Sequence, residues 1–158
     1  QGIGPSIIEI EFSKANNLIS QFNSLSEEDQ DKLRIALKRL NDVKIDSDWA
    51  NKNINLRICL ENLFCNGEGQ IAKTISERAP LYTDFSKSRA RNVYKFLSKA
   101  VHSGRPAEHD NITVQEITEQ IHKTVLKFLE EGEYPNWPAS PKSSRIKKLM
   151  KCVKSIFE

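Results

Sequence analysis

The apolar residues of this 158-residue chain recur every three or four positions along most of its length. That spacing gathers them on one side of an α-helix. Within residues 24–43, one such side holds Leu33, Ala36, Leu37 and Leu40. Ser24 or Ser26 is placed to cap this helix, because a serine oxygen accepts hydrogen bonds from the first backbone N–H groups. The repeated spacing predicts an all-α fold, an up-and-down helical bundle.

Turn-forming residues divide the pattern into segments. Helices are expected at residues 13–22, 24–43, 46–64, 69–80, 84–102 and 113–132. Ser47 is placed to cap the third of these, and Asn111 or Thr113 the last. Residues 6–12 instead alternate apolar and polar side chains for a few positions. That alternation predicts a short strand, although no partner strand is evident.

These segments give the domain organisation. An N-terminal segment, residues 1–25, precedes a helical bundle, residues 26–133; a Pro-rich linker, residues 134–142, leads to a basic amphipathic tail helix, residues 143–158. The expected bundle core contains Leu37, Leu40, Ile58, Phe64, Phe96, Leu97, Ile121 and Val125. The apolar stripe of the tail predicts docking on the bundle or on a second copy, with binding to RNA phosphates or to an anionic membrane as alternatives.

Charge is distributed unevenly along the chain. The formal net charge is +3, yet residues 142–158 hold six basic residues and one acidic residue, which leaves the remainder at −2. A globally basic nucleic-acid binder is therefore excluded, and any basic surface must be local.

The three cysteines form no C-x-x-C pair, which is typical of a reducing cytoplasm and not of a disulfide framework. Cys59 lies among apolar neighbours and is expected to be a buried structural thiol. No apolar run approaches the roughly 20 residues that cross a membrane, so no membrane partner is expected. A cytoplasmic location is the resulting expectation.

The helix expected at residues 84–102 has two different sides. Winding it at about 100° per residue places Val93, Tyr94, Phe96, Leu97, Ala100 and Val101 on an apolar side. The other side carries Arg91, Lys95, Ser98, Lys99 and His102. Most rows of this kind are solvated charged faces, and that interpretation stays open beside a catalytic one for His102.

Several short stretches resemble the HEPN superfamily (higher eukaryotes and prokaryotes nucleotide-binding), and its Apea-like branch in particular. The matching residues are Leu60, Glu61, Leu63 and Phe64, then Glu68, Ile71, Arg78 and Ala79, and finally Val101 and His102. The resemblance covers about residues 28–130, in order and at similar spacing. It implies a helical bundle, usually homodimeric, and in active members a metal-independent endoribonuclease without a cofactor.

The resemblance also implies roles for single residues. Active members place an Arg, then four to six intervening residues, and then a His on one helix. The His transfers a proton of the ribose 2′-hydroxyl, and the Arg stabilises phosphoryl charge. His102 is the expected acid–base residue, and Ser98 matches the polar neighbour of that Arg. The position five residues before His102 holds Leu97, so Lys95 is the expected substitute cation. Cations expected to bind RNA are Arg91, Lys99 and Arg105.

Three functions are compatible with these residues. The first is a weak or atypical ribonuclease. The second is a catalytically lost module that binds RNA or a cognate protein in a bacterial defence or toxin–antitoxin setting. The third is a structural or interaction domain of a longer chain with no role on nucleic acid. The pair His102 and His109 with Asp110 lacks a properly spaced further ligand, so no metal site is expected.

Overall fold

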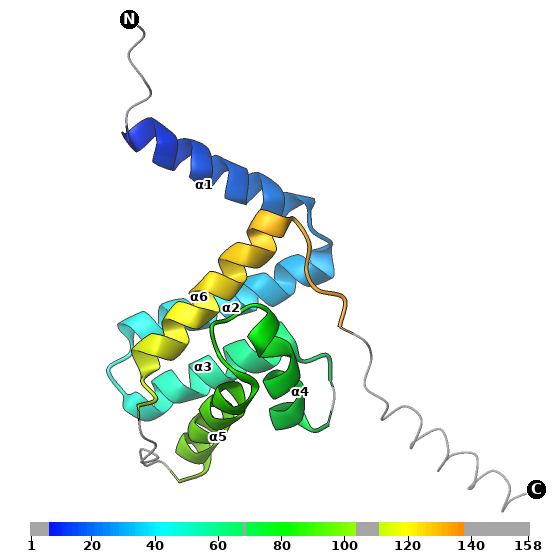
Figure 1. Cartoon of the computed structure of the whole chain (residues 1–158). Coiled ribbons are helices and arrows are strands. Elements are labelled where there is room, and N and C mark those ends of the chain that lie inside the picture. Colours follow the sequence, from blue (N-terminus) through cyan, green and yellow to red (C-terminus); the bar gives the residue numbers. More distant parts are fainter. Residues whose placement is uncertain (1–6, 68, 104–110, 138–158) are drawn as a thin grey trace, which may run out of the picture.

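The structure of the chain, a computed structural model, describes residues 7–67, 69–103 and 111–137. These residues form an all-α helical bundle (Figure 1), which confirms the predicted fold class. The helices are α1 (Ile7–Ser24), α2 (Glu27–Ile45), α3 (Trp49–Phe64), α4 (Ile71–Arg78), α5 (Lys87–Ser103) and α6 (Val114–Glu131). A short 3-10 turn, Ala79–Leu81, follows α4 directly. None of the helices within the described ranges is long and apolar enough to cross a membrane.

The strand predicted at residues 6–12 is wrong, because α1 already begins at Ile7. The described part of the chain contains no strand with which this segment would pair. An isolated strand would leave its backbone N–H and C=O groups without protein partners, whereas a helix pairs them internally. In Figure 1 most of α1 projects away from the bundle, and only its C-terminal end lies beside α6.

Side-chain caps fix where several helices begin. Ser26 accepts a hydrogen bond from the Asp29 backbone N–H at the start of α2, and Thr113 accepts one from Glu116 at the start of α6. At the start of α3 the cap is Asp48, which accepts from the Asn51 N–H at 2.8 Å. Ser47 was the wrong choice by one residue, because the carboxylate of Asp48 occupies the N-cap position itself.

The core lies where α3 packs against α2, α5 and α6. Among the predicted core residues, those buried are Leu40, Phe64, Phe96, Leu97, Ile121 and Val125. Two predictions fail: Leu37 is 43% exposed, and Ile58 is only half-buried. The buried positions of α2 are spaced by three, four and three residues, which is a narrow seam, and Leu37 lies one position beside it.

Cys59 is buried at the contact between α2 and α3. Its Sγ lies 3.5 Å from the Ala36 carbonyl oxygen and donates a weak hydrogen bond to it. Burial raises the pKa of the thiol to about 12. The predicted structural role of Cys59 therefore agrees with its environment, because a thiol with a raised pKa is a poor nucleophile.

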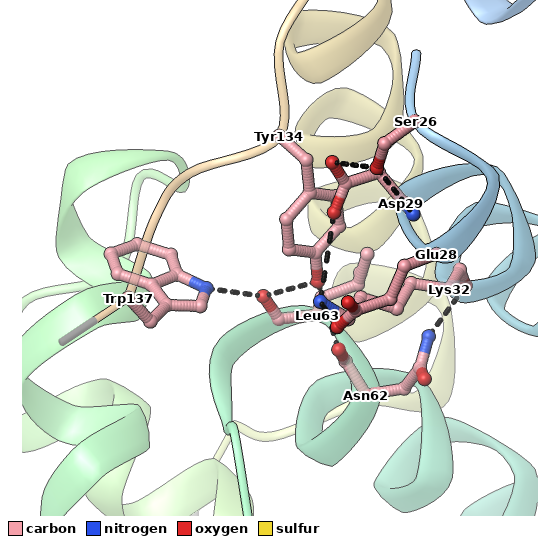
Figure 2. A network of polar contacts seen from close by, with 8 residues as sticks. All are labelled: Ser26, Glu28, Asp29, Lys32, Asn62, Leu63, Tyr134 and Trp137. Atoms are coloured by element: carbon pink, nitrogen blue, oxygen red, sulfur yellow. Dashed lines mark hydrogen bonds and ion pairs between the residues drawn. The ribbon is translucent and has the colours of Figure 1, made fainter. Parts of the chain in front are cut away.

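The chain after α6 folds back onto the end of α3. Residues 134–137, here named the C-terminal strap, lie at the start of the predicted linker (Figure 2). The Tyr134 hydroxyl lies 2.8 Å from the Asn62 carbonyl and 2.9 Å from that of Leu63, and the Trp137 indole N–H donates to Leu63 at 2.9 Å. The last carbonyls of a helix have no partner within it, and the strap supplies one. The rest of the linker and the tail helix lie outside the described residues.

Candidate functional site

Helix α5 is held rigidly on one side. Arg89 forms an ion pair with Glu116 at 2.5 Å and also donates to the Asn111 carbonyl, which joins the start of α5 to the start of α6. Further along, Phe96 meets Trp49 of α3 edge to face, with ring centroids 5.9 Å apart. The opposite side of α5 is therefore presented from a fixed scaffold.

That opposite side carries positive charge that no acidic residue of the same helix offsets. Helix α5 contains five basic residues and neither Asp nor Glu. Exposed cations recur at every fourth position, namely Lys87, Arg91, Lys95 and Lys99. These four residues are named the basic row. Like charges four residues apart destabilise a helix by about 0.2–0.5 kcal/mol per pair.

Helices α2 and α3, in contrast, pair cations with acidic residues of the same helix. In α2, Lys32 lies 2.8 Å from Glu28, and in α3 Arg57 lies 2.7 Å from Glu61. Within the described residues, Arg91 and Lys95 form no ion pair. The charge of α5 is thus a local feature and not a property of the whole surface.

The predicted catalytic residues occupy the C-terminal half of this helix. His102 is exposed in the last turn, and Lys95 is exposed seven residues earlier, about 10 Å away along the helix axis. The Ser98 hydroxyl between them is enclosed and makes no hydrogen bond within the described part of the chain. Arg105 lies outside the described residues.

Leu97 occupies the position that the resemblance assigns to an Arg, and it is 0% exposed. Its side chain belongs to the bundle core, as the helical winding predicts. A guanidinium at this position would lose its hydration without gaining a partner, which is costly. The position five residues before His102 therefore supplies no cation, and Lys95, seven residues before it, is the remaining candidate on this helix at the spacing that the resemblance implies.

A groove of about 720 Å³ opens between α4 and α5. Its lining residues include Lys73, Ser76 and Glu77 from α4 and Lys87, Arg91 and Tyr94 from α5. Glu77 is the one carboxylate among them, and its oxygen lies 3.7 Å from the Lys87 ammonium. Among the described lining residues, three cations face one carboxylate, which makes this part of the groove electropositive.

A polar network supports the wall of the groove. The Tyr94 hydroxyl donates to Glu61 at 2.6 Å, and Arg57 donates to the same carboxylate oxygen at 2.7 Å. Burial raises the pKa of Tyr94, and the hydrogen bond to Glu61 and the negative charge of Glu61 raise it further. Burial lowers the pKa of Arg57, but its interactions with Glu61 and Tyr94 outweigh this effect and leave it raised. The network thus holds Tyr94 neutral and Arg57 charged, and it fixes α5 to α3.

The structure divides the predicted site residues into two places. Arg91 lines the groove, whereas His102 is not among its lining residues and lies eleven residues away, about 16 Å along the helix. Sequence reasoning missed Lys73 and Lys87. Two signals in the sequence could have indicated Lys87. The helix contains no acidic residue, and Lys87 continues the four-residue spacing of the basic row.

Metal ligands do not cluster in the described ranges: no group of three or more His, Cys, Asp or Glu residues there is arranged to hold an ion. His109 and Asp110 lie outside those ranges. His122 is half-buried on α6, and burial lowers its pKa, with the charge of Lys44 acting in the same direction. This location agrees with a structural role.

Comparison with family models, with curated proteins and with solved structures found no match to the chain.

Proposed function

We propose that the chain is an RNA-binding module related to the HEPN endoribonucleases, with the basic row of α5 as its RNA-contacting face. The observation that carries this proposal is the charge of α5, which has five basic residues and no acidic one. Such a row costs the helix some stability when no anion is bound. A polyanion removes that repulsion and releases its own counterions when it binds.

The length of the basic row suits a nucleic-acid strand. Lys87 and Lys99 lie twelve residues apart, about 18 Å along the axis. A strand following the helix would place several phosphates within reach of these side chains. Single-stranded RNA is the proposed ligand because of His102 at the end of the row. The HEPN resemblance assigns to this residue proton transfer at a ribose 2′-hydroxyl, a group that DNA lacks.

Binding dominates over cleavage in this proposal. Leu97 is buried where a catalytic Arg would be required, and Lys95 offers a point charge instead of a planar fork. We propose a homodimer, because the HEPN resemblance implies that two chains bring their His-containing helices together over RNA. A role in bacterial defence or a toxin–antitoxin pair, and a cytoplasmic location, rest on the resemblance and the cysteine content alone.

The salt dependence of RNA binding tests the proposal. For a single strand, log Kobs falls against log salt concentration with a slope of about −0.7 per phosphate contact. Four contacts predict a slope of about −3, and Lys95→Gln should reduce its magnitude by about 0.7. Lys38→Gln on the exposed face of α2 removes the same charge and should leave the slope unchanged. Equal effects of the two substitutions would contradict a specific role for α5.

One observation favours a second function, that of a protein-interaction domain. On the projecting helix α1, Phe12 is 69% exposed and Ile19 is 58% exposed, and the two lie seven residues apart on one face. Two large apolar side chains on one exposed helix face are typical of a surface that packs against another helix. Light scattering of wild type and of a Phe12→Ser, Ile19→Ser double variant tests this function. A dimer that dissociates in the variant supports it, and an unchanged mass contradicts it.

A further inference from the structure

The groove between α4 and α5 gathers positive charge from two helices that are separate in sequence. Lys73 comes from α4, and Lys87 and Arg91 come from α5. We infer that this groove is a phosphate-binding site in which Arg91 is the principal contact. The inference deepens the RNA-binding function proposed above and rests on it for the source of the phosphate in the cell.

The groove leaves its cations available to a ligand. Arg91 makes no ion pair within the described residues, and its guanidinium presents a planar fork that matches two phosphate oxygens at once. Lys87 is held only loosely by Glu77, because their 3.7 Å separation exceeds a normal N–H···O hydrogen bond and both side chains are largely exposed. Concave surfaces lined by one sign of charge concentrate ions of the opposite sign.

Two hydroxyl groups of the groove are already engaged. The Tyr94 hydroxyl donates its proton to Glu61, and the Ser76 hydroxyl donates its own to the Lys73 carbonyl at 2.7 Å. Neither group has a second proton to offer. The remaining side-chain donors of the described lining are the three cations and the Gln70 amide, and the excess of cations favours an anionic ligand over a neutral one.

The size of the groove fits a phosphate together with the group that carries it. A volume of about 720 Å³ lies within the range of small-molecule sites and far exceeds the space that an inorganic phosphate needs. Two sources share this chemistry: a phosphodiester within an RNA strand and a monoester at its end. The number of charges distinguishes them, because a monoester carries almost two negative charges at neutral pH.

Inorganic phosphate is the probe for the first experiment, titrated into the full chain at constant low ionic strength and followed by calorimetry or by chemical shifts. Arg91→Gln should weaken phosphate binding about tenfold, the loss expected for one charge-assisted contact. Glu77→Gln should tighten it, because the substitution removes the one repelling carboxylate. The matched control is Lys38→Gln, which removes a charge from the exposed face of α2, outside both the groove and the basic row, and should leave phosphate affinity within twofold.

Opposite signs for Arg91→Gln and Glu77→Gln support the inference. Equal phosphate affinities for wild type, Arg91→Gln and Lys38→Gln overturn it. RNA binding by Lys95→Gln tests the proposed function separately. If Lys95→Gln weakens RNA binding while Arg91→Gln leaves phosphate binding intact, α5 binds RNA and the groove is not a phosphate site.

Two RNA oligonucleotides of one sequence, with and without a 5′-phosphate, then identify the source. Tighter binding of the phosphorylated strand, lost in Arg91→Gln, assigns the groove to a terminal monoester. Equal binding of both strands, weakened to the same extent by Arg91→Gln, assigns it to the backbone. Equal binding that Arg91→Gln does not change would overturn the link between the groove and RNA.

Discussion

The Tyr94 hydroxyl donates a 2.6 Å hydrogen bond to the Glu61 carboxylate, and this contact joins the wall of the groove to α3 across 33 residues of sequence. The same oxygen of Glu61 also accepts from Arg57. The side of α5 that faces the bundle is thus fixed by a charged network, while the side that faces away carries the basic row.

Tyr94→Phe removes this hydrogen bond and keeps the ring. We expect the free energy of unfolding to fall by about 1 kcal/mol, because Glu61 loses one of two donors but keeps Arg57. Urea denaturation measures the change. Tyr82→Phe is the control, since the Tyr82 ring is packed but its hydroxyl donates no hydrogen bond within the described residues. Equal losses for the two variants would mean that the Tyr94–Glu61 contact adds no stability.

Alkaline pH should destabilise the fold through Cys59. Burial raises the pKa of this thiol from 9.0 to about 12. Above pH 9 the unfolded chain releases the thiol proton while the folded chain retains it, so the unfolded state gains stability as pH rises. The free energy of unfolding should fall by up to about 1.4 kcal/mol per pH unit between pH 9 and 12.

Denaturation curves across this pH range test the effect. Cys59→Ala should reduce the slope, whatever its effect on stability at neutral pH, and Cys65→Ala should retain it. A slope that is identical in wild type and Cys59→Ala would assign the alkaline loss to the tyrosines.

Substitutions of Leu97 test how α5 is oriented. Leu97→Ala should lower the free energy of unfolding by about 2–5 kcal/mol, as truncation of a buried leucine does. Leu97→Arg should cost at least as much, because it buries a charge without a partner. Leu37→Ala, on an exposed leucine of α2, should change stability by less than about 1 kcal/mol. A folded and more active Leu97→Arg variant would instead place this position at a cleft between two copies.

His102→Ala tests the catalytic hypothesis. We expect wild-type cleavage of single-stranded RNA in a metal-free buffer to be weak or absent. Any cleavage that is present should fall by about 10²–10⁴-fold in the variant, because one proton-transfer group is lost. The fold should remain intact because His102 is exposed. Robust cleavage that His102→Ala leaves unchanged would contradict a catalytic role for His102 and favour its interpretation as part of a solvated charged face.

Features that depend on nearby residues were predictable from the sequence. The capping oxygens of Ser26 and Thr113 lie within three residues of the groups they bind, and the buried positions of α6 follow directly from helical spacing. Ser47 and Leu37 show the limit of this approach. Each lies one position beside the correct residue, and a periodic pattern alone does not resolve neighbours at that precision.

Features that depend on tertiary packing were not predictable. The groove exists because α4 packs against α5, so that Lys73 and Lys87 line one concavity although they are fourteen residues apart. The partner of Tyr94 lies on another helix, and helical winding assigns Tyr94 to an apolar side without naming that partner. The flanking prolines predict a linker around Trp137. Its contact with α3 was not predictable, because a single residue outside a helix belongs to no periodic pattern.

The C-terminal strap can reach α3 only late in biosynthesis. The Leu63 carbonyl acquires its indole donor from a residue translated 74 positions later. At about 5–20 residues per second, a ribosome needs roughly 4–15 s to add those residues. During that interval α2 and α3 can pair with each other, and Arg78 can donate to the Phe64 carbonyl, but the Leu63 carbonyl must rely on water in place of the strap. A nascent chain stalled before Trp137 should therefore expose this end of α3 to proteases, and a chain released after it should protect the same peptide bonds.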